Sequence, residues 1–120
     1  MPSDDPSLRV RMRDALQQAM KDRDRVSVAA LRSALGAIDN AEAVRVEGPA
    51  DYGDGGMGEH GLGMAEAMRA ALTDDDVAGI VREEIEERLA EAAEFEGCGQ
   101  DERAALLRSE AGVLARQLDG

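Results

Sequence analysis

Between Thr73 and Glu96 the apolar residues return at spacings of three and four, a period that places them on one face of an α-helix. These apolar positions are Val77, Val81, Ile85, Leu89 and Ala92. Thr73 precedes three aspartates, a pattern typical of a helix N-terminus, and the glycines on either side of Cys98 readily end a helix. The segment therefore predicts an amphipathic helix that must bury one face against other elements.

The same period recurs in three other segments. It predicts helices over about 8–22 and 25–45, with Ser7 and Asp24 as their N-caps, and a last helix over about 101–118. Their expected inward-facing residues are Leu8, Met12, Ala15, Leu16, Ala19, Met20, Val28, Leu31, Leu35, Ile38, Ala104, Leu107, Ala111, Leu114 and Leu118. No segment shows the two-residue period of a strand. We expect an all-α fold, an antiparallel helical bundle of about four main helices.

Glycines gather between the two predicted helix pairs. Residues 47–63 read as a flexible insertion, and residues 64–72 as either a short helix or a continuation of it. With residues 1–7 as a flexible tail, residues 8–120 form one expected domain. Residues 53–58 match G-x-G-x-x-G literally, but no strand precedes them, so we interpret the match as loop rather than a nucleotide site.

The charge of the chain is unevenly distributed. The formal net charge is −12, yet residues 1–46 hold 8 Lys/Arg against 7 Asp/Glu, while residues 47–120 hold 6 against 19. Any contact with phosphate groups is therefore expected from the first half. The chain contains no run of apolar residues long enough to span a bilayer and does not begin like a signal peptide, so we expect a cytoplasmic protein with neither membrane nor DNA as partner.

Few residues are candidates for catalysis. The one histidine, His60, lies in the glycine-rich stretch, and the one cysteine, Cys98, lies among acidic residues that disfavour a thiolate. The glutamates at 83–96, with Arg82 and Arg88 interleaved, are typical of a solvated helix face. The sequence thus predicts no catalytic residue, no metal site and no cofactor.

Two sets of residues are candidates for binding. The first is a basic set at the junction of the first two helices, a candidate nucleic-acid contact made of Lys21, Arg23, Arg25, Arg32 and Asn40. A structural interpretation stays open, in which Asp24 is a cap and Arg32 and Asn40 bond across the bundle. The second set, Leu106 and Val113, lies off the main apolar face of the last helix and is a candidate protein contact.

The run Ala19-Met20-Lys21-Asp22-Arg23-Asp24, together with Leu31-Arg32 and the segments 37–42, 81–84 and 94–101, resembles the GatB/YqeY family. That family is named after the helical tail domain of the B subunit of the tRNA-dependent amidotransferase and free-standing relatives. The likeness covers roughly residues 8–46 and 73–118. The resemblance implies an all-helical accessory module. If the chain were labelled a glutamine-dependent carbon–nitrogen ligase, that label would come from the family and not from any site in this chain.

The function expected from the sequence is therefore a non-catalytic accessory or interaction module. The resemblance implies tRNA, or an amidotransferase-related protein, as partner. The alternative is a protein-binding module with no RNA role. The sequence leaves the oligomeric state open.

Overall fold

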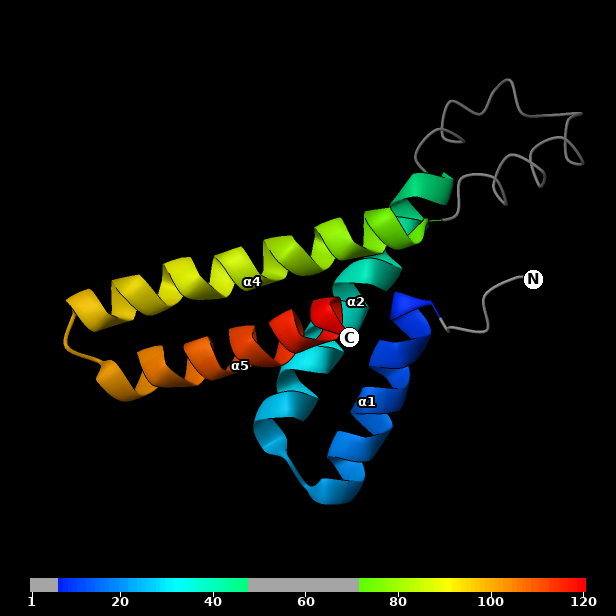
Figure 1. Ribbon diagram of the computed structural model, residues 1–120. Helices are drawn as coiled ribbons and strands as arrows, with labels where there is room; N and C mark the ends of the chain where they lie inside the picture. Colours follow the sequence, from blue (N-terminus) through cyan, green and yellow to red (C-terminus); the bar gives the residue numbers. More distant parts are fainter. Residues whose placement is uncertain (1–6, 48–71) are drawn as a thin grey trace, which may run out of the picture.

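Four helices make up the part of the chain described by the computed structural model, residues 7–47 and 72–120 (Figure 1). They are α1 (Leu8–Asp22), α2 (Arg25–Glu47), α4 (Asp74–Gly97) and α5 (Asp101–Asp119). Because the helices pack against one another and no strand occurs in the described ranges, the predicted all-α bundle is confirmed. The predicted tail, the insertion at 47–63 and the segment 64–72 lie almost wholly outside the described residues.

The helix ends follow local hydrogen-bonding chemistry. The Ser7 hydroxyl accepts from the Val10 N–H at 3.2 Å, and the Asp24 carboxylate accepts from the Ser27 N–H at 3.2 Å. At α4, Thr73 and Asp76 form a reciprocal capping box, in which each side chain accepts from the other residue's N–H. All three predicted N-caps are therefore confirmed.

The core lies where all four helices meet. Its largest fully buried side chains are Met12, Leu31, Ile38, Val81 and Leu114. Two residues expected inside lie at the surface instead, because Met20 is 48% exposed and Leu89 is 45% exposed. Residues on one arc of the helical wheel are therefore not equally covered by the other helices.

A buried ionic network joins three of the helices. Arg88 is only 8% exposed; its Nε donates to Glu110 of α5 at 2.9 Å, and its Nη1 donates to the Glu84 carboxylate at 2.9 Å. The Ser33 hydroxyl of α2 donates to the same Glu84 carboxylate at 3.2 Å. The prediction that Arg88 belongs to a solvated face is wrong, because Arg88 lies seven residues after buried Val81 and shares its face.

The molecule has two arms. The α4–α5 hairpin projects well past α2, and the turn between α1 and α2 points in another direction, toward the bottom of the view (Figure 1). The overall extents are 58 × 39 × 23 Å. Among the described helices, none has the length and apolar character required to cross a membrane.

Candidate nucleic-acid interface

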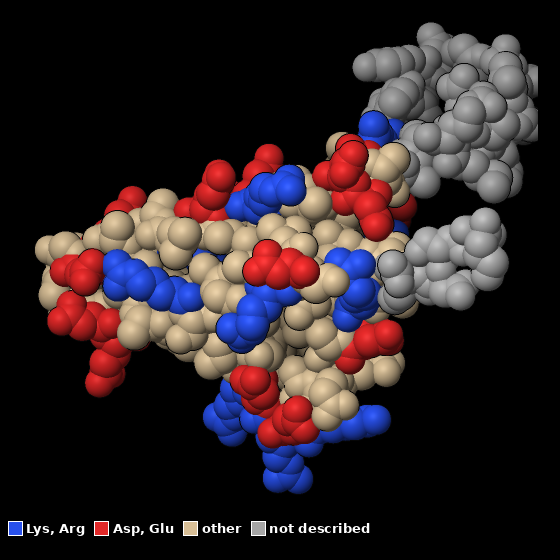
Figure 2. Space-filling view, in the orientation of Figure 1, with Lys and Arg blue, Asp and Glu red and all other residues tan. Residues whose placement is uncertain are grey.

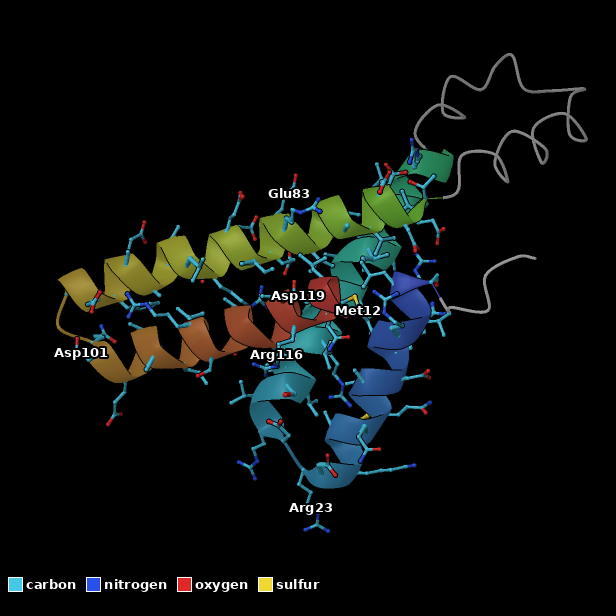
Figure 3. All side chains as sticks on the ribbon, in the orientation of Figure 1. Met12, Arg23, Glu83, Asp101, Arg116 and Asp119 are labelled. Carbon is cyan, nitrogen blue, oxygen red and sulfur yellow. The ribbon has the colours of Figure 1, made fainter. Side chains whose placement is uncertain are left out.

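The candidate interface lies at the turn between α1 and α2. Arg23 ends α1 in the left-handed conformation, with φ 58° and ψ 37°, and its N–H donates to the carbonyls of Ala19 and Met20. Asp24 then caps α2. Figure 3 shows the Arg23 side chain at the far end of this arm, directed away from the helices. The tight turn thus brings the end of one helix and the start of the next into one exposed corner.

Three arginines line a single hollow in this corner. The open hollow has a volume of about 520 Å³ and is formed by Met20, Arg23, Arg25, Val28, Ala29 and Arg32. Residues 25, 28, 29 and 32 have the spacing that places them on one face of α2. We call these six residues the basic corner. Its lining combines three guanidinium groups with apolar side chains and contains no carboxylate.

The charges of the basic corner are available to a ligand. Within the described ranges, Arg23, Arg25 and Arg32 form no ion pair. The neighbouring Asp24 is occupied by its capping role, and hydrogen bonds from the Ser27 hydroxyl and N–H hold the pKa of Asp24 below its ordinary value of 3.8. Figure 2 shows basic side chains gathered at this end of the molecule, with acidic side chains just above them.

The structure brings only part of the predicted set together. All five predicted residues are exposed, but only Arg23, Arg25 and Arg32 line the hollow. Lys21 lies in the last turn of α1, and Asn40 lies eight residues past Arg32, about 12 Å along α2. The structural interpretation predicted that Asp24 caps α2, and this cap is present. It also predicted that Arg32 and Asn40 bond across the bundle, and neither does so within the described residues.

The apolar part of the lining of this hollow was not predicted. Met20 and Val28 were assigned to the core by their helical period, whereas both line the basic corner. Each of the two lies three residues from an arginine, close to the tight turn between α1 and α2. This proximity could have indicated that they share a surface with the arginines.

The two predicted protein-contact residues have different surroundings. Leu106 is 46% exposed and lines an open hollow of about 640 Å³ at the end of the hairpin. Val113 is 6% exposed and belongs to the same core cluster as Leu8 and Met12, so its prediction as a contact residue is wrong. Both lie on one stripe of α5, seven residues apart, but the other helices cover only the Val113 end.

The described residues contain no group of three or more His, Cys, Asp or Glu arranged to hold a metal ion. Cys98 is exposed at the end of α4. His60 and the glycine motif at 53–58 lie outside the described residues.

No family model, curated protein or solved structure matches the chain. The resemblance to the GatB/YqeY family and the division into tail, domain and insertion therefore stay predictions from the sequence. The fold and the site define an all-helical protein with a basic and apolar corner on one arm and an acidic hairpin on the other.

Proposed function

We propose that this protein is a non-catalytic helical accessory module that contacts RNA phosphates through the basic corner. The observation that carries the proposal is the convergence of Arg23, Arg25 and Arg32, none of them paired within the described residues, on one hollow. The resemblance to the GatB/YqeY family supports tRNA as the RNA and an amidation system as the setting.

The chemistry of the corner suits phosphate groups. A guanidinium presents several N–H donors in a planar fork that matches the oxygens of a phosphate, and it stays charged at every physiological pH. The Arg23 backbone supports the same conclusion. A left-handed residue costs about 1 kcal/mol unless it is glycine, so an arginine at this position favours a role for its side chain.

The rest of the surface limits where RNA can bind. Residues 74–119, which contain α4 and α5, hold 14 acidic residues against 5 basic ones. A phosphate backbone is repelled there, so RNA would contact the α1–α2 arm alone. Such a small contact involves about three or four phosphates, and binding should weaken steeply as salt rises.

The test is filter binding of a tRNA transcript at low salt. The corner variant Arg25→Glu/Arg32→Glu should lose about tenfold in affinity for each contact removed, and its logarithmic salt slope should fall by about two units. The matched control is Arg13→Glu/Arg82→Glu, which changes the net charge equally at exposed positions outside the hollow. Equal losses in both variants, or no binding by the unmodified protein, would overturn the proposal.

The alternative is a protein-binding module with no RNA role. It is favoured by Leu106, a large apolar side chain exposed at the end of a projecting hairpin. Absence of tRNA binding in the experiment above would favour this alternative.

A further inference from the structure

Each arm of the molecule ends in a hollow, and the two hollows have opposite charge. The basic corner lies at the end of the α1–α2 arm. The other hollow is formed by the hairpin tip, which we define as Gly99, Gln100, Asp101, Glu102, Arg103 and Leu106. The two hollows have similar volumes, about 520 and 640 Å³.

The hairpin tip presents unpaired acids beside an apolar side chain. Asp101 and Glu102 form no ion pair with any described residue. The basic residues nearby are engaged, because Arg103 lies over the Phe95 ring at 5.2 Å from its centroid and Arg108 binds Glu96 at 2.8 Å. Leu106, at 46% exposure, supplies the apolar part.

The basic corner has the complementary composition. Its arginines are unpaired within the described ranges, and Met20 beside them is 48% exposed. Carboxylates and guanidiniums form strong paired hydrogen bonds, and Leu106 against Met20 would remove apolar surface from water at the same contact. Charge and apolar surface therefore match between the two ends of one chain.

From this match we infer that the hairpin tip of one copy docks into the basic corner of a second copy. The arms point in different directions, the hairpin to the left and the corner downward (Figure 1). A second copy can be related to the first by a two-fold axis that passes midway between tip and corner, perpendicular to the line that joins them. Each tip can then meet the other copy's corner, which gives a closed dimer with two identical contacts.

The net charge selects this arrangement over others. Each copy carries a formal charge of −12, so contacts that set one hairpin against another are repulsive. The basic corner, by contrast, attracts the acidic tip. Each contact is small, but once the first has formed the second is intramolecular, so the pair is more stable than either contact alone. A dimer of this kind is weak and sensitive to salt.

The test is sedimentation equilibrium with two charge-reversed variants. The corner variant Arg25→Glu/Arg32→Glu has two acidic ends, and the tip variant Asp101→Lys/Glu102→Lys has two basic ends. Each should be monomeric alone at low salt, where the unmodified protein dimerises. An equimolar mixture should form a heterodimer, because both contacts are restored between unlike copies. Dimers should dissociate at about 0.5 M salt, where screening acts over a few ångströms.

The mixture also controls for folding, since only folded variants can restore the dimer. The charge-matched variant Arg13→Glu/Arg82→Glu should dimerise like the unmodified protein. Three results would each overturn the inference: an unmodified protein that is monomeric at about 100 μM and low salt, variants that dimerise alone, or a mixture that stays monomeric. The tip variant keeps the basic corner, so its tRNA binding tests the proposed function independently of self-association.

Discussion

Replacing Arg88 with methionine tests the ionic network that joins α2, α4 and α5. The substitution keeps an unbranched side chain in the space but removes the guanidinium. Burial opposes the charge of Arg88, but its hydrogen bonds to Glu84 and Glu110 outweigh that effect and raise the pKa of Arg88 above its ordinary value. The arginine is therefore charged at neutral pH, and its loss leaves the Glu84 and Glu110 carboxylates without this cation.

The expected loss of stability follows from the burial of the partners. Removing one member of a buried ion pair costs roughly 3–5 kcal/mol, because the remaining charge is left unsolvated. The Glu84 and Glu110 side chains keep 16% and 15% exposure, so water can relieve part of that cost. We therefore expect the lower end, about 3 kcal/mol, or a fall in the melting temperature of about 10 °C for a chain of this size.

Urea unfolding followed by circular dichroism measures this loss. Arg82→Met on the same helix is the matched control, since Arg82 is exposed and should change stability by about 0.5 kcal/mol or less. Adding Glu84→Gln and Glu110→Gln to Arg88→Met should recover part of the loss, because the unpaired charges are then removed. A loss under about 1 kcal/mol, or no recovery on neutralisation, would refute the reasoning.

Two further predictions concern the helix ends. Arg23→Gly should be about 1 kcal/mol more stable than Arg23→Ala in urea unfolding, since only glycine adopts φ 58° without cost, and equal stabilities would count against strain at this turn. The Thr73 N–H and then Arg45 hold the pKa of Asp76 below 3.8, so its charge stabilises the fold above about pH 4 and this contribution disappears as the pH falls through the lower folded value. Asp76→Asn should accordingly be less stable than the unmodified protein at pH 7 but not at the acid end of a pH series; a constant difference across that series would contradict this assignment.

The helix ends were predictable because their chemistry is local. Ser7, Asp24 and Thr73 each bond to N–H groups within three residues, so the sequence alone contains both partners. The same holds for the turn after α4, where Gly99 takes φ +81°. These contacts do not depend on how the helices pack, and all of them occur in the structure.

The extent of the core could not be predicted in the same way. The helical period shows which residues share a face, but not how far a neighbouring helix covers that face. Leu106 and Val113 share a stripe of α5, yet one is 46% exposed and the other 6%. Arg88 shares a face with Val81, and its burial depends on Glu110 from another helix, which spacing along α4 cannot reveal.

The basic corner was partly predictable, because two of its arginines lie on one helix. Arg25 and Arg32 are seven residues apart on one helix, so their shared face follows from the sequence. The position of Arg23 depends instead on a left-handed backbone at a residue that is not glycine, and the apolar part of the lining depends on the exposure of Met20.

The two proposals assign different partners to the same corner, and the chemistry of the corner explains how both can fit. Three guanidiniums beside apolar side chains suit closely spaced anions next to an apolar group. RNA offers phosphates beside bases, and the hairpin tip offers Asp101 and Glu102 beside Leu106. Because both ligands need the same arginines, a corner occupied by a second copy is closed to RNA. Self-association and RNA binding would therefore compete, and both would weaken with salt because both depend on those charges.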